Sequence, residues 1–379
     1  MAAPHFRVSS VEFRRAVVGR VPFLLSFILL TTTCNWFHPQ PLTQSDRREL
    51  AARFKTLVAD TGGAQIWIKH PARLRHGQST DTLQALATPP AYRSVLSRVQ
   101  QESQKDNLDL ATSASTSSGK LQAVTLKVMR SGQEIIQIHL REVPQLLRAA
   151  IVIDDMGQDL AAAHKLLALD YPLTFSILPY QRYTQVIAQE AHRNGREVML
   201  HLPMEPETGA HASPGEGAIR VGMHAAEVER VVQNDLALIP YVAGVNNHMG
   251  SRATQDAALM ADVMSILARH RLYFIDSRTT AATVALEEAR RQHLPAFYRT
   301  VFLDDTETVD YTLRQLQKFR QTVEEEGVAL AIGHPHPTTI AALAKFLPQF
   351  ERADIELVMP SQIVHLPELA RLHPPASKN

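Results

Sequence analysis

The sequence has a single cysteine, Cys34, among 379 residues. One cysteine excludes an internal disulfide and any cysteine-rich metal site. It also excludes cysteine catalysis, because Cys34 lies in an apolar N-terminal segment and not in a folded domain. The chain likewise lacks an excess of charge of either sign, since 39 Lys and Arg are balanced by 38 Asp and Glu. A protein that binds nucleic acid through bulk charge would carry a basic excess, so we expect no nucleic-acid partner.

Several common catalytic motifs are also missing. No G-x-S-x-G nucleophile elbow, Walker A loop, H-E-x-x-H motif or Rossmann glycine fingerprint occurs in a fitting context. Histidine, in contrast, is abundant, with 17 residues, and the hydrophobic content of 45% is that of a globular protein. A chain of this length predicts two domains with additional segments.

Residues 1–40 predict a signal peptide or a membrane anchor. Several arginines precede an uncharged run at residues 21–37, and this order places the rest of the chain outside the cytoplasm. The run of 17 residues is at the short limit for a spanning helix. No Ala-x-Ala site follows it, which favours a retained anchor over a cleaved signal peptide. Lipidation of Cys34 is a weaker alternative.

Residues 41–145 predict a small α+β unit. Residues 102–120 are polar and rich in Ser and Thr, which is typical of a flexible linker. Alternating apolar and polar residues on both sides of Ser131-Gly132 predict a β-hairpin of residues 121–129 and 134–140. The sequence also predicts helices at 49–58 and 91–101 and a strand at 64–69. No chemistry is visible in this unit, so packing, spacing and binding of a protein partner all stay open.

From residue 148 to residue 370, short apolar runs alternate with amphipathic segments of helical length. This alternation predicts βα units and a parallel sheet. Seven or eight such units are enough for a closed or nearly closed barrel. The expected strands are residues 149–153, 174–178, 198–202, 244–247, 272–275, 301–303, 328–332 and 356–359. The expected helices are residues 158–169, 184–193, 224–238, 257–270, 309–325 and 340–350.

Polar side chains that can bind metals end most of these predicted strands. In a parallel barrel the active site is built at the carboxyl ends of the strands, so residues far apart in sequence converge there. A single polar residue at a strand end is more often an ordinary surface residue, but the same pattern on six strands is much harder to explain in that way. The groups are Asp154-Asp155, His201, Asn246-Asn247-His248, Asp276-Ser277-Arg278, Asp304-Asp305 and His334-Pro335-His336.

The pair Asp154-Asp155 is the strongest of these signals. Adjacent carboxylates after a buried strand repel each other unless a cation or a shared proton relieves them. One of them can coordinate a metal while the other acts as a general base. The alternative is an exposed loop or a helix cap before Met156-Gly157. The second pair, Asp304-Asp305, is more ambiguous, and we leave it out of the site.

His201 and His248 are the best candidates for imidazole ligands, because imidazole with carboxylate suits Zn²⁺ and other first-row ions. Asn247 lies in a tight loop in which Gly250 permits close approach of the backbone to a ligand. Glu205 is expected to line the site or to serve as a fourth ligand. The alternative for each histidine is a purely structural role.

His334 and His336 have prolines on both sides, which restrict the backbone and hold the imidazoles in place. One of them, placed near the metal, can protonate a leaving amine. A rigid turn with two solvent-facing histidines is the alternative. Asp276 and Arg278 predict a carboxylate that orients a catalytic group beside a cation that binds substrate, or else a salt bridge.

Five segments in this order, IVIDDMG, LHLPMEP, NNHMGS, FIDSRT and AIGHPHP, resemble the divergent polysaccharide deacetylase family of bacterial envelope proteins. That family is related to the carbohydrate esterases that remove N-acetyl or O-acetyl groups from chitin-like and peptidoglycan sugars. The resemblance covers residues 148–370 and leaves out the N-terminal third. It implies a distorted parallel (β/α) barrel in an exported protein that is periplasmic, or anchored in the inner membrane and facing the periplasm.

By this resemblance Asp154 is the catalytic base, Asp155 and His201 are metal ligands, and His334 is the catalytic acid. The chain departs from the pattern of the broader esterases, whose two histidines lie on one H-x-x-x-H segment, because Glu205 stands at the second position. His248 can supply the missing imidazole.

The leading hypothesis is therefore a metal-dependent hydrolase, with Zn²⁺ as the favoured cofactor, that removes acetyl groups from an envelope polysaccharide or oligosaccharide by means of a metal-activated water. The alternative is a catalytically inactive, deacetylase-like module that binds glycan or a protein partner. Phosphoester hydrolysis is less favoured, because no basic cluster lies near the histidine motifs.

Overall fold

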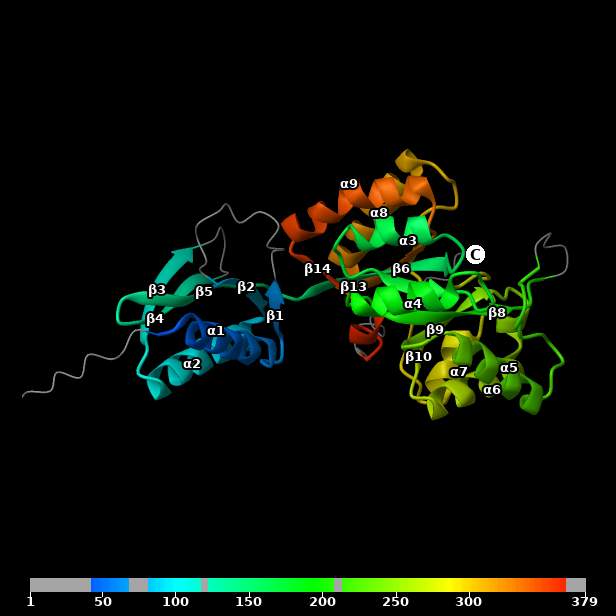
Figure 1. Ribbon diagram of the computed structural model, residues 1–379, viewed down its shortest axis with the longest axis horizontal. Helices are drawn as coiled ribbons and strands as arrows, with labels where there is room; N and C mark the ends of the chain where they lie inside the picture. Colours follow the sequence, from blue (N-terminus) through cyan, green and yellow to red (C-terminus); the bar gives the residue numbers. More distant parts are fainter. Residues whose placement is uncertain (1–41, 68–80, 117–121, 208–212, 366–379) are drawn as a thin grey trace, which may run out of the picture. The chain divides into compact units, whose positions relative to one another are not determined.

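The computed structural model describes residues 42–67, 81–116, 122–207 and 213–365. These residues form a five-stranded sheet in the N-terminal part of the chain and a nine-stranded sheet in the remainder (Figure 1). Each sheet has its own buried hydrophobic cluster. The predicted export segment, residues 1–40, lies outside the described residues. Within the part of the chain that is described, no helix is both long and apolar enough to span a bilayer.

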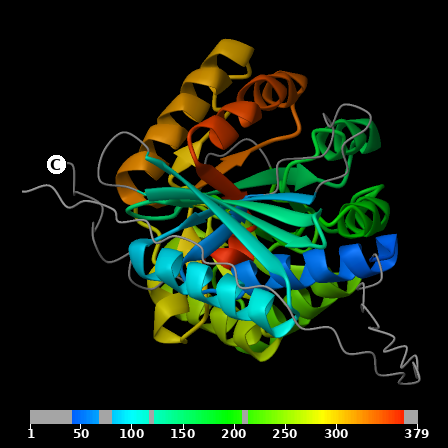
Figure 2. The ribbon, with the colours of Figure 1, turned by 90° about the vertical axis from the view of Figure 1, so that its left-hand side faces the viewer.

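The N-terminal part is an α+β unit with strand order β1-β2-β5-β4-β3. Both helices cover one face of the sheet (Figure 2). Alternate residues of β4, namely Val124, Leu126 and Val128, are buried, as expected for a sheet with one covered face. The elements are α1 (Gln44–Ala59), β1 (Ala64–Trp67), β2 (Asp81–Ala87), α2 (Pro89–Lys105), β3 (Asp109–Thr116), β4 (Gln122–Arg130) and β5 (Gln133–Glu142).

The structure differs from the sequence prediction at residues 102–120, where we expected a flexible linker. Helix α2 continues to Lys105, and residues 109–116 form β3, which pairs antiparallel with β4 along its whole length. Strand β3 consists mainly of small residues, so its sequence shows no clear alternation of apolar and polar side chains. Pairing with β4 compensates for the weak β-propensity of these residues. The predicted hairpin is confirmed as β4 and β5.

The second part alternates strands and helices, and all its strand pairs are parallel. Most predicted elements are present within a few residues of their expected ends, and α4 has the predicted bounds. The sequence missed β11 and α7. The strands are β6 (Leu147–Met156), β7 (Thr174–Ile177), β8 (Val198–Met204), β9 (Val242–Met249), β10 (Tyr273–Asp276), β11 (Ala296–Tyr298), β12 (Val301–Phe302), β13 (Val328–Gly333) and β14 (Ile355–Val358). The helices are α3 (Leu160–Leu167), α4 (Thr184–Arg193), α5 (Ala225–Leu238), α6 (Ala257–Arg269), α7 (Ala285–Arg291), α8 (Val309–Glu326) and α9 (Pro337–Arg352).

The parallel sheet curls but does not close. Its order is β11-β10-β9-β8-β7-β6-β13-β12, and β14 pairs with the first half of β6. Among the described residues, β11 and β12 do not pair with each other, although the sequence left a closed barrel open as a possibility. Both strands are very short, with three and two residues, so neither offers enough backbone for a ladder across the gap.

Successive residues of β6 belong to different hydrophobic clusters. Ala149, Ile151 and Ile153 pack in the cluster that includes the helices, whereas Ala150 and Val152 pack in a second cluster enclosed by the curled sheet. Because both faces are buried, the strand reads as a continuous apolar run without alternation. The residues on both faces of β6 are therefore packed in apolar core, and its polar residues Asp154 and Asp155 come near the carboxyl end of the strand.

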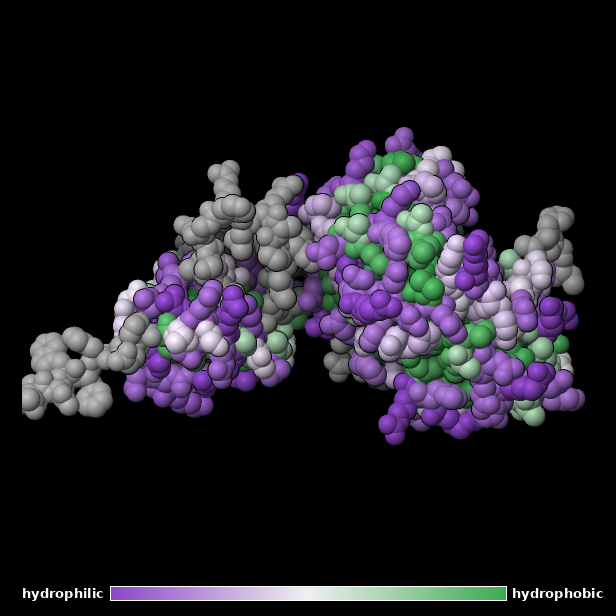
Figure 3. All heavy atoms as spheres, viewed as in Figure 1, coloured by the Kyte–Doolittle hydropathy of each residue, from purple (hydrophilic) through white to green (hydrophobic). Residues whose placement is uncertain are grey.

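The helices turn apolar stripes toward the sheet and polar residues toward solvent. In α8 the buried residues Leu316, Phe319 and Val323 recur at helical spacing. The face drawn in Figure 3 is accordingly hydrophilic over most of the described residues, with hydrophobic patches between polar side chains.

Candidate metal centre and active site

The parallel register aligns the carboxyl ends of five strands. His201 on β8 pairs with Asn246 on β9, which in turn pairs with Ile275 on β10. On the other side, Gly333 at the end of β13 pairs with Ile153 on β6. The polar residues that follow these positions must therefore meet at one edge of the sheet.

A bulge at the end of β6 turns both carboxylates of the Asp154-Asp155 pair into this region. Successive side chains of a regular strand point to opposite faces. The register of β6 against β7 shifts between Ile153 and Met156, and Asp155 has a left-handed φ of 53°. A non-glycine residue in that conformation is uncommon and is often found at functional sites. The local backbone thus places the two carboxylates side by side.

Asp155, His201 and His248 form a compact group of potential metal ligands. Asp155 Oδ1 lies 3.2 Å from His201 Nε2 and 3.0 Å from His248 Nδ1, and the two nitrogens are 3.1 Å apart. Tetrahedral Zn²⁺ with bonds of about 2.0 Å has ligand–ligand edges of roughly 3.3 Å. Asp155 Oδ1 is buried without a hydrogen-bond partner. The donor atoms therefore fit a cation of this size.

Asn246 fixes the tautomer of His201. Its Oδ1 accepts a hydrogen bond from Nδ1 of His201 over 2.9 Å, so the lone pair of His201 resides on Nε2, which faces Asp155. The Nδ2 group of Asn246 donates to Asp154 Oδ1 over 2.8 Å and to Ser277 Oγ over 3.1 Å. The sequence analysis did not select Asn246, although it stands beside the predicted Asn247 and His248.

The two adjacent carboxylates have opposite pKa shifts. Burial raises the pKa of Asp154, which is only 3% exposed, and the neighbouring His201 charge opposes this rise. Burial acts in the same direction on Asp155, but its contacts with His201 and His248 outweigh it and lower the pKa of Asp155. Such a separation suits two different roles, one carboxylate that takes up a proton and one that stays ionised.

His334 approaches the same carboxylates from β13. Its Nε2 lies 3.8 Å from Asp155 Oδ2, and its Nδ1 donates a hydrogen bond of 3.0 Å to Asp304 Oδ1. Burial opposes protonation of His334, but the hydrogen bond to Asp304 and the charges of Asp154, Asp304 and Asp155 raise its pKa to about 9. The imidazole is therefore cationic at neutral pH and can donate a proton.

Asp304 is the residue that the sequence analysis passed over. Its Oδ2 accepts hydrogen bonds from the backbone N–H of His334 over 2.6 Å and from the Thr339 hydroxyl over 2.7 Å. With both oxygens engaged, the carboxylate fixes the position of His334. The available signal was its place at a strand end, the same signal that selected Asp154.

Glu205 is not placed with the metal ligands. Its Oε1 lies 2.6 Å from Nη1 of Arg252, and its Oε2 accepts a hydrogen bond of 2.7 Å from the backbone N–H of Val221. Through these contacts the Glu205 carboxylate connects the segment of Val221 with that of Arg252. Glu205 is therefore outside the potential ligand groups of the described residues, and its role as a residue that lines the site stays a prediction.

Asn247 also makes its contacts within the protein. Its Oδ1 accepts a hydrogen bond of 2.9 Å from the Ser277 backbone, and its Nδ2 donates to the Met249 carbonyl over 2.8 Å. The Oδ1 contact thus connects β9 to the segment after β10, whereas the Nδ2 contact stays within β9. The predicted lining role of Asn247 stays a prediction.

Asp276 and Arg278 form a turn and not a side-chain salt bridge. Asp276 accepts hydrogen bonds from the backbone N–H of Arg278 over 2.8 Å and from the Thr283 hydroxyl over 3.0 Å. The Arg278 guanidinium lies 5.2 Å from the ring centre of Tyr298. Arg299, which the sequence did not single out, donates to the backbone carbonyls of Ser277 and Arg278 and so braces this turn.

His336 lies beside His334, with ring centres 5.7 Å apart, and its Nδ1 is 3.8 Å from Glu307 Oε2. Asp304, His334 and His336 are close enough to form a second potential ligand group. The direct hydrogen bond between Asp304 and His334 already accounts for that proximity, so the group around Asp155 is the stronger candidate for a metal site.

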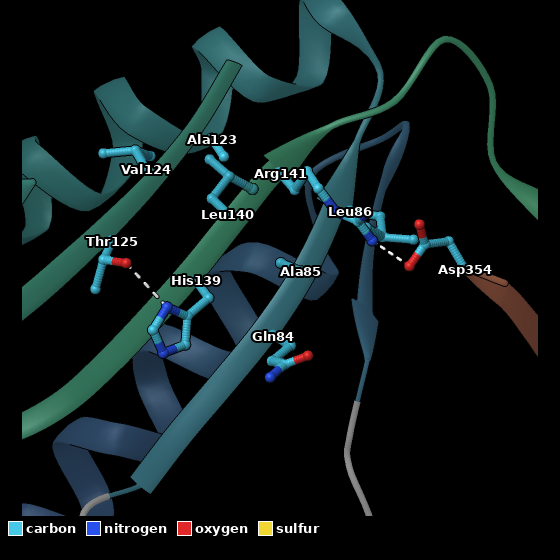
Figure 4. Close-up of a pocket in the computed structure, with 10 residues that line it drawn as sticks. All are labelled: Gln84, Ala85, Leu86, Ala123, Val124, Thr125, His139, Leu140, Arg141 and Asp354. Carbon is cyan, nitrogen blue, oxygen red and sulfur yellow. Dashed lines mark hydrogen bonds and ion pairs between the residues drawn. The ribbon is translucent and has the colours of Figure 1, made fainter. Parts of the chain in front are cut away.

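A separate hollow occurs on the five-stranded sheet (Figure 4). Gln84, Thr125 and His139 line it from three neighbouring strands, and the Thr125 hydroxyl lies 2.9 Å from Nδ1 of His139. Neither potential ligand group of the described residues lies in this hollow. We therefore assign it no catalytic role.

Comparisons with known proteins agree with the predicted resemblance. A family model described as divergent polysaccharide deacetylase matches residues 151–364. The uncharacterized protein YibQ of Escherichia coli (strain K12) is 33% identical over 228 residues, which cover 60% of this chain and 70% of that protein. An uncharacterized protein of Haemophilus influenzae is 36% identical over 211 residues, which cover 56% of this chain and 74% of that protein.

Among solved structures, this fold is similar to that of an uncharacterized protein from Agrobacterium tumefaciens C58. The TM-score is 0.55 at 25% sequence identity, and the match covers 57% of this chain and 89% of the other. The matched share of this chain corresponds in length to the curled parallel sheet together with its helices.

Proposed function

This chain belongs to the divergent polysaccharide deacetylase family, and on that premise we propose that it is a metal-dependent hydrolase that removes acetyl groups from a glycan of the cell envelope. The observation that carries the proposal is the placement of two acid–base groups around one ligand cluster. Asp154 Oδ2 lies 3.6 Å from His201 Nε2, and His334 Nε2 lies 3.8 Å from Asp155 Oδ2. A base and an acid thus face one metal-binding group from two different strands.

We assign Asp155, His201 and His248 as the ligands, and Zn²⁺ as the ion, because one carboxylate with two imidazoles is a ligand set suited to zinc. When bound, the ion supplies a Lewis acid that polarises the acyl carbonyl and lowers the pKa of a water molecule. Three protein ligands leave a coordination position open, as a catalytic site requires.

Asp154 is assigned as the general base. Its raised pKa makes it a stronger base than an exposed aspartate, and the hydrogen bond from Asn246 holds its Oδ1 in place. Oδ2 is then the oxygen that accepts the proton of the attacking water. The water oxygen adds to the acyl carbon, and the resulting tetrahedral species carries the former carbonyl oxygen as an anion.

His334 is assigned as the general acid. At neutral pH its imidazolium can protonate the nitrogen of the tetrahedral species as the carbon–nitrogen bond breaks, so acetate and a free amine are released. Asp304 acts through His334, because its hydrogen bond stabilises the cation and aims Nε2 toward the carboxylates. The same arrangement would serve an O-acetyl ester, with an alcohol as the leaving group.

The organisation of the chain is part of the proposal. We propose that residues 1–40 direct export and tether the protein on the periplasmic side of the inner membrane, and that residues 41–145 form a unit separate from the catalytic part of residues 148–370. The separate hydrophobic clusters of the two described sheets support this division. The N-terminal unit would serve as a spacer or bind a protein partner.

A direct assay tests the proposed activity. The full chain, purified and loaded with Zn²⁺, is incubated with N-acetylglucosamine oligomers, and released acetate is measured together with the metal content of the protein. We expect acetate release that a chelator abolishes and that added Zn²⁺ restores. A metal-loaded, folded protein that binds these oligomers without releasing acetate would instead support the inactive glycan-binding module.

A further inference from the structure

Tyr180 is an exposed aromatic residue in a strained backbone conformation. It lies in the loop after β7, has a φ of 58°, and is 39% exposed. Single exposed aromatic residues are common and need no explanation by themselves. A bulky residue with positive φ is a real outlier, however, and such strain persists only where the surrounding structure enforces it.

The backbone of Gly217 packs closely against the ring of Tyr180. A Cβ atom added to Gly217 would lie 2.8 Å from Cε2 of Tyr180 and 2.4 Å from Oδ1 of Asp235. Gly217 also has a positive φ of 76°. Only glycine combines that conformation with such a close approach, so the chain packs its backbone directly against the ring and the carboxyl group.

Asp235 is the third unusual residue at this place. It lies on α5 with 0% exposure, and neither of its carboxyl oxygens has a hydrogen-bond partner of good geometry among the described residues. Burial raises the pKa of Asp235 to about 7, while the neighbouring Tyr180 hydroxyl lowers it and the charge of Glu216 raises it. Buried polar groups without partners are rare and call for an explanation.

The loops that carry Tyr180 and Gly217 are bonded to segments next to the candidate active site. The loop of Tyr180 is fixed to the segment after Asp155, because Leu178 N donates to the Met156 carbonyl and Tyr183 N donates to the Gly157 carbonyl, each over 2.8 Å. The loop of Gly217 is fixed close to His201 by a hydrogen bond of 2.9 Å from Ile219 N to the carbonyl of Pro203. The loop of Tyr180 is thus bonded to the segment after Asp155 on β6, and the loop of Gly217 is bonded to the end of β8, the strand of His201.

We propose that Tyr180 is a platform on which a sugar ring of the glycan packs beside the residue that loses its acetyl group, and that Asp235 is a positioning residue for this platform. The inference rests on the proposed function for the kind of ligand. A tyrosine ring offers a rigid apolar face with a polar edge, which complements the apolar C–H face and the hydroxyl rim of a pyranose. Gly217 and Asp235 hold the ring in place before the glycan arrives, which reduces the entropy lost on binding.

Binding of chitotetraose tests the platform. The affinity is measured by calorimetry on Zn²⁺-loaded full chain carrying Asp154→Asn, so that the oligomer is not consumed. We expect Tyr180→Ala to weaken binding roughly 5- to 10-fold. Tyr180→Phe, which keeps the ring, should retain most of the affinity. In the active enzyme the same Tyr180→Ala change should raise KM for the tetramer more than KM for the monosaccharide, because only the longer substrate reaches the platform.

Asp235 is tested by a pair of variants. Asp235→Ala should lose affinity for the tetramer, whereas Asp235→Asn, which keeps the shape of the side chain, should restore it. If Asp235 had a purely structural role, Asp235→Ala would lower the melting temperature and would affect the tetramer and the monosaccharide equally.

Tyr241 provides a matched control. It is also exposed, at 56%, and has a φ of 66°, but it precedes β9 at the opposite end of the sheet and stacks on His192. Tyr241→Ala should leave tetramer binding unchanged. An equal loss in both tyrosine variants, or unchanged binding by Tyr180→Ala, would overturn the platform while acetate release by the wild-type enzyme still stood. A wild-type protein that neither binds the tetramer nor releases acetate would overturn both proposals.

Discussion

Nδ1 of His248 lies 3.1 Å from Nε2 of His201, although the two residues are 47 positions apart in the chain. Both nitrogens also lie within 3.2 Å of Asp155 Oδ1. Because Asn246 Oδ1 accepts the proton on Nδ1 of His201, the lone pair of His201 lies on Nε2, which faces both His248 and Asp155. We propose that His248, on the adjacent strand, supplies the imidazole that the sequence lacks at residue 205.

Asp154→Asn should abolish acetate release while the protein keeps its metal. Asparagine preserves the shape of the side chain but cannot accept the proton of the attacking water, so we expect kcat to fall roughly 10²- to 10⁴-fold. Kinetics on an acetylated oligomer and metal analysis of the same preparation check this. Asp305→Asn, at the exposed member of the second aspartate pair, is the control and should keep full activity. Wild-type turnover by Asp154→Asn would remove Asp154 from the role of base.

His248→Gln and Glu205→Gln should differ in metal content. Loss of the His248 imidazole removes one of three ligands, so we expect at least about 100-fold weaker Zn²⁺ binding. Glu205→Gln should keep the metal, because its carboxylate is bonded to Arg252 and Val221. A Zn²⁺ titration with a competing chelator measures both. The opposite pattern, with metal lost only from Glu205→Gln, would return Glu205 to the ligand set.

Asn246→Ala should weaken metal binding without removing a ligand. The change takes away the acceptor that keeps the His201 proton on Nδ1 and the donor that holds Asp154. Mutation of a residue that hydrogen-bonds to a metal ligand typically lowers metal affinity or activity about 10- to 100-fold. Asn247→Ala is a neighbouring control that disturbs loop contacts only and should bind Zn²⁺ more tightly than Asn246→Ala.

The pKa of His334 should depend on Asp304 and on the metal. In the metal-free protein we expect His334 to titrate at about 9, since burial is outweighed by the hydrogen bond to Asp304 and by the surrounding carboxylates. Asp304→Asn should lower this pKa toward its ordinary value of 6.5. Bound Zn²⁺ should also lower it, because the ion neutralises Asp155. Histidine titration by NMR measures each effect, and a His334 pKa that does not respond to Asp304→Asn would contradict the assigned pairing.

The folded chain should become less stable as the pH rises from about 4 to 7 because of Asp235. Burial raises the pKa of Asp235 from 3.8 to about 7, so the folded state holds this proton more tightly than the unfolded state does. Its contribution is fully present below pH 3.8 and is lost as the pH rises through 7. Above pH 7, Asp235→Asn should therefore exceed the wild type in free energy of unfolding, by at most about 4 kcal/mol. Urea unfolding at pH 5 and pH 8 checks this, and an unchanged difference between the two proteins would exclude it.

The sequence by itself determined most of the parallel α/β part. Apolar runs of strand length and amphipathic helical segments have different periods, and both periods are visible without any tertiary information. The same reasoning missed β2, β3, β11 and α7. Strand β3 is built from small polar residues, and β11 has only three residues, so neither shows a period. Their existence depends on the neighbouring strand with which each one pairs.

The sequence also indicated which side chains would gather, because parallel strands bring their carboxyl ends to one edge. It could not indicate how they pair. Asn246, Asp304 and Tyr180 gave no strong signal, since an asparagine, a second aspartate pair and an exposed tyrosine are ordinary in any chain. Only the register of the strands, the bulge at Asp155 and the close approach of Gly217 decided which atoms meet. Those are contacts between residues far apart in sequence, and their geometry is set by packing that no local pattern records.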